Sequence, residues 1–113
     1  MAKTTFAAPI LPGKTDAWKA ACAEISGSRK DEYIAGRKAL GITKEIACLQ
    51  ETPHGDYVAV YIEADDVTGI LQKMLDATDP FNTWFKEAVL KEVHGMDGNS
   101  PVPPTNPVFI GIL

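Results

Sequence analysis

One stretch of the chain, residues 45–63, constrains the fold more than any other. Two short apolar runs, EIACLQE and YVAVYIE, flank the segment TPHGD, which holds a proline, a glycine and an aspartate. This pattern predicts a β-hairpin with a loop of about five residues. We place Glu51 opposite Tyr57, so the alternation of strand side chains puts Glu51, Tyr57 and Tyr61 on one face.

Both faces of this hairpin are largely apolar, and both therefore need cover. Helices of the same chain can cover one face, on which we place Ile46, Cys48, Gln50, Val58, Val60 and Ile62. The other face needs a ligand, a partner subunit or both, and it carries Ala47, Leu49, Glu51, Tyr57, Ala59 and Tyr61.

Before the hairpin, the spacing of apolar residues predicts one strand and a pair of helices. Residues 4–11 are expected to form the strand, and residues 15–25 the first helix. Ser28 is the expected N-cap of a second helix that runs to Leu40.

After the hairpin, the pattern predicts a second pair of helices and a last strand. One helix starts near residue 67, and the next begins at Asp79-Pro80, an N-cap followed by proline, and ends at Gly95. Residues 97–107 are rich in proline and glycine and should be irregular, and residues 108–113 should form the strand.

The expected order is therefore βαββαβ with each helix split in two, which is the ferredoxin-like plan. The whole chain, residues 1–113, should form a single α+β domain with a four-stranded antiparallel sheet. Its uncovered apolar face predicts a homodimer in which two sheets pack face to face into a barrel. Such an obligate interface buries more than about 2,000 Å².

Composition excludes several classes of partner. A net charge of −4 and a pI near 5.0 argue against nucleic acid and against an anionic membrane surface. No apolar run approaches the length of about 20 residues that spans a bilayer, and the N-terminus resembles no secretory signal. The expected location is the cytoplasm, with Cys22 and Cys48 as reduced, buried thiols.

The full chain resembles the dimeric α+β-barrel superfamily, and within it the L-rhamnose mutarotase family. The segments Ser100-Pro101-Val102 and Val108-Phe109 are similar to the end of that family's chains. Trp84-Phe85 stands where the family has a Trp-Trp pair, and the spacing from Phe6 to Trp18 and Cys22 also matches.

This resemblance implies a cofactor-free isomerase that acts on a sugar ring, but one motif differs. The family carries Tyr-x-x-x-His on its first helix, and the histidine transfers the proton. Trp18 and Cys22 occupy these positions here, and neither exchanges a proton at neutral pH as imidazole does. Other members of the superfamily include cofactor-free monooxygenases, EthD-like proteins and haem-binding branches.

The residues suggest a site on the hairpin face that carries Glu51, which would be its catalytic acid or base. We expect it between the sheet and the open edge of the helices. The expected ligand-binding residues are Tyr57, Tyr61, Trp84, Phe85, Arg29, Tyr33, Arg37 and His54.

Each of these residues also has a purely structural interpretation. Arg29, Tyr33 and Arg37 lie at spacings of four, so they form either an anion-facing pocket edge or a solvated helix face. His54 is expected in the hairpin loop and His94 at a helix C-terminus, where a cation is favoured. No motif indicates a metal or a cofactor. A small-molecule enzyme and a non-catalytic dimer therefore both remain open.

Overall fold

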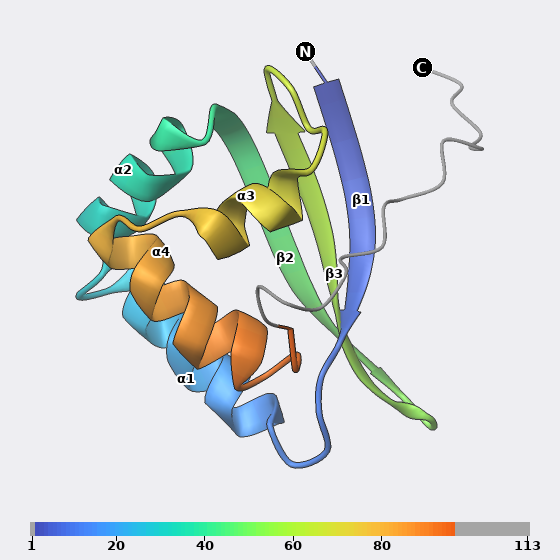
Figure 1. Cartoon of the computed structure of the whole chain (residues 1–113). Helices are drawn as coiled ribbons and strands as arrows, with labels where there is room; N and C mark the ends of the chain where they lie inside the picture. The colour runs from blue at the N-terminus through green and yellow to red at the C-terminus, as the bar shows by residue number, and fades with distance from the viewer. Residues whose placement is uncertain (1, 97–113) are drawn as a thin grey trace.

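The computed structural model describes residues 2–96, which form an α+β structure with all its helices on one face of an antiparallel sheet (Figure 1). The described strands have the order β1-β3-β2 and are β1 (Ala2–Pro9), β2 (Ile42–Thr52) and β3 (Gly55–Ala64). The helices are α1 (Thr15–Ser26), α2 (Lys30–Ala39), α3 (Ile70–Asp76), α4 (Pro80–Phe85) and its π-helical continuation η1 (Lys86–Lys91). The predicted last strand, at 108–113, and the irregular segment 97–107 lie outside the described residues.

Local signals locate some helix ends well and others poorly. Asp79 caps α4 as predicted: its carboxylate accepts a hydrogen bond from the backbone N–H of Asn82 at 3.1 Å, and Pro80 follows. The prediction of Ser28 as an N-cap is wrong, because α2 begins after Arg29 without a side-chain cap. α3 begins three residues later than expected, after Gly69, whose φ of +63° is the left-handed conformation.

The predicted register of the hairpin is also wrong. β2 and β3 are joined by a two-residue turn, Pro53-His54, and Glu51 lies opposite Asp56 instead of Tyr57. A shift of one residue moves every side chain of a strand to the other face of the sheet. Ala47 and Leu49 therefore face the helices together with Val58, Val60 and Ile62, whereas Ile46, Cys48 and Gln50 face away from them.

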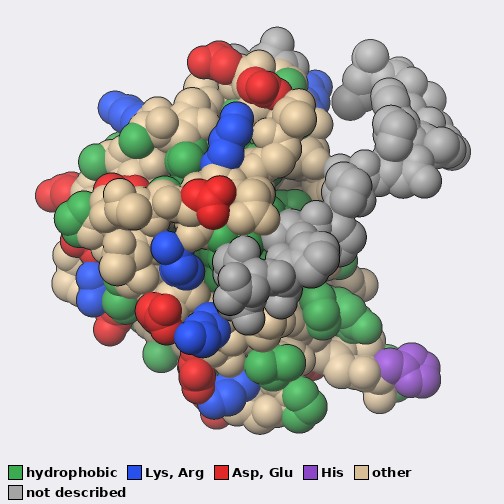
Figure 2. Space-filling model, viewed as in Figure 1, with side chains coloured by type: hydrophobic (Ala, Val, Ile, Leu, Met, Phe, Trp, Pro, Cys, Tyr) green, Lys and Arg blue, Asp and Glu red, His purple; other side chains and the backbone are tan. Residues whose placement is uncertain are grey.

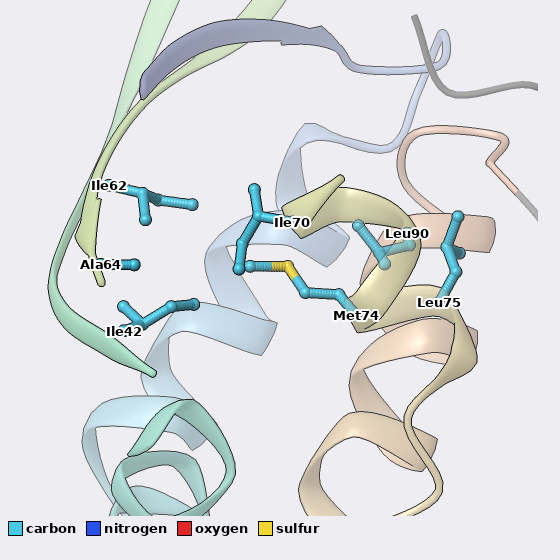
Figure 3. Close-up of a cluster of buried hydrophobic side chains, with 7 residues drawn as sticks. All are labelled: Ile42, Ile62, Ala64, Ile70, Met74, Leu75 and Leu90. Atoms are coloured by element: carbon cyan, nitrogen blue, oxygen red, sulfur yellow. The ribbon is translucent and has the colours of Figure 1, made fainter. Parts of the chain in front are cut away.

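Two apolar clusters hold the helices on the sheet. The larger one, seen in Figure 3, joins strand residues to α3 and η1 and consists of Ile42, Ile62, Ala64, Ile70, Met74, Leu75 and Leu90. The smaller one lies toward the other end of β3 and consists of Ile10, Val58 and Val93. Complete burial of one such large aliphatic side chain contributes about 1.5–3 kcal/mol, so these clusters fix the helices firmly over both ends of the sheet.

The face of the sheet opposite the helices, which we term the open face, has no cover among the described residues. It carries Ile46, which is 47% exposed, and the exposed thiol of Cys48. The prediction that Cys48 is buried is therefore wrong in this chain, because the register turns it outward. Cys22 is partly buried, and neither thiol is in a disulfide. None of the described helices is long and apolar enough to cross a membrane.

Candidate functional site

A cavity of about 260 Å³ lies between the sheet and the helices. Its floor is a row of paired residues, one from each strand: Phe6 of β1, Val60 of β3 and Ala47 of β2. The next row adds Ala8 and Val58. Its walls come from α1, α3 and the α4–η1 segment and are mainly apolar, with Trp18, Ala21, Cys22, Ile25, Leu71, Met74, Phe85, Val89, Leu90 and Met96.

A buried ion pair lies at one end of this cavity. Nε of Arg37 donates to Oε1 of Glu45 at 2.9 Å, and the two side chains are only 5% and 13% exposed. The hydroxyl of Tyr33 donates to the same oxygen at 2.7 Å. Burial raises the pKa of Tyr33, and the Glu45 carboxylate raises it further, so Tyr33 remains a neutral donor.

The side chain of Arg37 is held from several directions. Its Nη1 donates to Oδ1 of Asn82 at 2.9 Å, and Asn82 in turn donates to Asp79 at 2.7 Å. The guanidinium also lies 4.5 Å from the ring centroid of Phe85 and 5.1 Å from that of Phe81, within the range of cation–π attraction. These contacts leave Nη2 as the guanidinium nitrogen without a hydrogen-bond partner in residues 2–96.

A histidine lies toward the other end of the cavity. His94 is 9% exposed, and its Nδ1 lies 2.8 Å from the carbonyl oxygen of Pro9. Because a carbonyl can only accept, Nδ1 carries the proton and donates it, which leaves Nε2 with a free lone pair when the ring is neutral. Burial lowers the pKa of His94, so the neutral form is favoured.

The π-helical geometry of η1 places His94. Wide turns connect N–H groups to the fifth preceding carbonyl, as in the bonds from Glu92 to Glu87 and from His94 to Val89. Such a widened turn rotates the following residues relative to an α-helix, and turns of this kind are frequent at functional sites.

The strand register shows how far apart the two polar ends are. His94 binds Pro9, which lies opposite Tyr57, whereas Glu45 lies opposite Ile62. These positions are five residues apart along β3, which corresponds to roughly 17 Å. The cavity thus has a neutral histidine toward one end, an Arg–Glu pair at the other and an apolar floor between them.

Three of the residues predicted for the site line this cavity, namely Tyr33, Arg37 and Phe85. Arg29 and Trp84 lie outside it and contact each other, with the guanidinium 4.3 Å from the ring centroid. Arg29, which directly precedes α2, also forms ion pairs with Glu24 and Glu32, so its charge is balanced outside the cavity.

The other predicted residues lie away from the cavity. Tyr57 and Tyr61 are on the open face, because they pair with Gln50 and Ile46 of β2. Glu51 is exposed near the end of the hairpin and does not line the cavity. His54 is exposed in the turn, and Figure 2 shows a histidine at the projecting hairpin tip.

Sequence reasoning missed Glu45 and His94 as cavity residues. His94 lies four residues after the buried Leu90, and this spacing places both residues on the same side of a helix. Glu45 alternates with Ala47 and Leu49 along the strand, so the correct register would have placed Glu45 on the face that the helices cover.

No protein-family model, curated protein or solved structure matches this chain. Within residues 2–96, no group of three or more His, Cys, Asp or Glu side chains is arranged to hold a metal ion. The function is therefore argued from the cavity and its polar groups.

Proposed function

We propose that this protein binds a small molecule in the cavity and transfers a proton to and from it without a cofactor. The observation that carries the proposal is a buried histidine whose Nε2 has no hydrogen-bond partner within residues 2–96, in a cavity that is apolar apart from the cluster of Tyr33, Arg37 and Glu45. A general base of this kind contributes about 10²–10⁴-fold to a rate. The reaction class is that of a cofactor-free isomerase or monooxygenase.

The polar groups have complementary roles in such a reaction. Nε2 of His94 takes a proton from an acidic O–H or C–H group of the ligand, and the bonding electron pair stays on the ligand. The guanidinium of Arg37 at the other end can donate through Nη2 to an oxygen on which negative charge develops. An isomerase then returns the proton to a different atom. In a monooxygenase the carbanion form of the ligand adds dioxygen to give a peroxide, which takes the proton back and loses water, so that one oxygen atom stays on the ligand as a carbonyl and the other leaves in the water.

The proposal includes the ferredoxin-like fold. The order β1-β3-β2 is the order of the first three strands in that fold, with β1 and β2 both antiparallel to the strand between them. A strand from residues 108–113 beside β1 would complete the sheet.

The open face supports the homodimer that forms a closed barrel. Ile46 and Cys48 are exposed there, beside Ala7, Pro9 and Ala59. Light scattering should give a dimer mass at micromolar concentration, and Ile46→Lys, which puts a charge on the open face of both subunits, should give a monomer. A monomeric parent protein would refute the dimer without affecting the cavity.

Hydrogen–deuterium exchange tests the catalytic part. Small cyclic ketones and phenols are incubated with the protein in D₂O, and NMR follows loss of the signals from the C–H groups next to the carbonyl or ortho to the hydroxyl. The parent and His54→Gln should accelerate exchange of at least one ligand, whereas His94→Gln should not. Equal exchange by the His94 variant would eliminate His94 as the base.

A ligand-binding protein without catalysis is the second candidate. The observation that favours it is that the hydrogen bonds of Tyr33, Glu45, Arg37 and Asn82 already satisfy one another, as in a structural network. In that case ligands bind in the cavity, but neither the parent nor any variant accelerates exchange.

A further inference from the structure

The cavity has no net charge in its resting state. Five titratable side chains line it: Arg37, Glu45, Tyr33, Cys22 and His94. The positive charge of Arg37 is matched by Glu45 at 2.9 Å. Burial raises the pKa of the Cys22 thiol and lowers that of His94, so both are neutral near pH 7, as is Tyr33. A charged group placed over the apolar floor would have no counter-charge, and its burial would cost several kcal/mol.

The cavity also has few polar atoms to offer a ligand. The hydrogen bonds described above already engage Nε and Nη1 of Arg37, Oε1 of Glu45 and Nδ1 of His94. The floor and most of the wall are hydrocarbon. A sugar carries a hydroxyl on nearly every ring carbon, and each buried hydroxyl without a partner costs about 1–3 kcal/mol. The lining therefore disfavours a sugar.

Size and lining both suit an aromatic ring. An engineered apolar cavity of about 150 Å³ holds one benzene molecule, so a cavity of about 260 Å³ accommodates one or two rings. Aromatic side chains contribute to its lining on several sides, from Phe6 in the sheet, Trp18 in α1 and Phe85 at the end of α4. Ring pairs gain about 0.5–1.5 kcal/mol beyond their buried area.

We infer that the ligand is a neutral phenol of one or two rings whose hydroxyl donates to Nε2 of His94. This inference rests on the proposed function and specifies its ligand class. The phenol hydroxyl supplies the donor that Nε2 lacks, and the rings cover the apolar floor. Proton transfer in this arrangement breaks the ligand O–H bond, forms an N–H bond on Nε2 and leaves the electron pair on the phenolate oxygen.

Three probes with the same ring system test the inference on the full chain at pH 7.5: 2-naphthol, naphthalene and 2-naphthoate. L-rhamnose is the sugar probe. Calorimetry measures each Kd. Fluorescence of a Trp84→Phe protein, in which Trp18 is the remaining tryptophan, reports whether the probe enters the cavity. We expect 2-naphthol to quench Trp18 and to bind at least tenfold more tightly than naphthalene or 2-naphthoate.

Histidine variants locate the hydroxyl contact. His94→Phe keeps a ring but removes the acceptor, so it should bind 2-naphthol no more tightly than naphthalene. His94→Gln keeps an acceptor oxygen and should retain part of the preference, and His54→Phe is the matched control. The same tenfold preference in His94→Phe would refute the contact.

The outcomes separate this inference from the proposed function. Tighter binding of 2-naphthoate or of L-rhamnose than of 2-naphthol, with quenching of Trp18, would overturn the neutral phenol and leave the cavity as a ligand site. Failure of all four probes to quench Trp18 or release heat would overturn both.

Discussion

Removal of the charge of Glu45 gives the most direct test of the polar cluster. At an effective dielectric constant of 20, two unit charges about 4 Å apart attract by about 4 kcal/mol. Arg37 and Glu45 are close to such a pair, with 2.9 Å between Nε and Oε1 and side chains 5% and 13% exposed. In Glu45→Gln, the amide oxygen can still accept from Tyr33, but Arg37 becomes a buried cation without its counter-charge. We expect a loss of about 2–4 kcal/mol in the free energy of unfolding.

A double-mutant cycle isolates the pair from its neighbours. Arg37→Met should cost about 3–5 kcal/mol, because it leaves a buried carboxylate and an unpaired Asn82 oxygen. The double variant Arg37→Met/Glu45→Gln buries no charge, so it should be no less stable than Arg37→Met alone. A double variant whose loss equals the sum of the two single losses would refute the argument that these charges act as a buried pair.

Urea unfolding, followed by tryptophan fluorescence and circular dichroism, measures these free energies. Protein concentration is held constant, because dimerisation would couple stability to concentration. For a chain of this length, 1 kcal/mol corresponds to about 4 °C in Tm. The matched control is Glu87→Gln, which breaks the exposed Lys91–Glu87 pair at 3.8 Å. It should leave the unfolding midpoint unchanged, because exposed pairs contribute little.

Changes at Gly36 and His94 and the labelling of Cys48 each test one feature of the structure. Gly36→Ala should lower the free energy of unfolding by about 1–3 kcal/mol in urea titration, because its Cβ would lie 2.9 Å from Oδ2 of Asp79; an unchanged midpoint would contradict this. Acidification from pH 7.5 to 5.5 should destabilise the parent protein more than the His94→Phe variant in thermal unfolding. The reason is that burial lowers the pKa of His94, so the unfolded chain binds a proton there that the folded chain does not. Identical pH profiles of the two proteins would contradict this prediction. Alkylation of Cys48 should slow as dimers form with rising protein concentration, while that of Cys22 stays constant; a constant Cys48 rate would argue against the open-face dimer.

Sequence reasoning succeeded where short-range chemistry decides the structure. The start of α4 follows from Asp79 and Pro80 alone. The Asp79 side chain accepts a hydrogen bond from a backbone N–H of the first turn, and Pro80 occupies the first helical position, where no N–H is required. The first helix and the hairpin were located by periodicity, since apolar spacing distinguishes helices from strands directly. Of the three residues at spacings of four, Tyr33 and Arg37 line the cavity together because residues four apart share one face of a helix, whereas Arg29 lies outside it.

The predictions that failed depend on relations between segments. The loop length sets the hairpin register, and TPHGD is compatible with both a five-residue loop and the two-residue turn at Pro53-His54. With the shorter turn, each side chain of β2 points to the face opposite to the predicted one, and Cys48 is therefore exposed. The position of His94 depends on the π-helical turns of η1, which no residue type in 86–91 specifies by itself.

The same register decides which carboxylate can take part in cavity chemistry. Glu45 and Glu51 have the same parity in β2, so both point to the face that the helices cover. Their position along the strand separates them: Glu45 lies opposite the fully buried Ile62, whereas the exposed Glu51 lies opposite Asp56, next to the hairpin turn. At Glu45, side chains of α2 approach the sheet, and there the carboxylate meets a guanidinium and a phenol. Because Arg37 neutralises Glu45, we propose the histidine toward the other end of the cavity, and not a carboxylate, as its base.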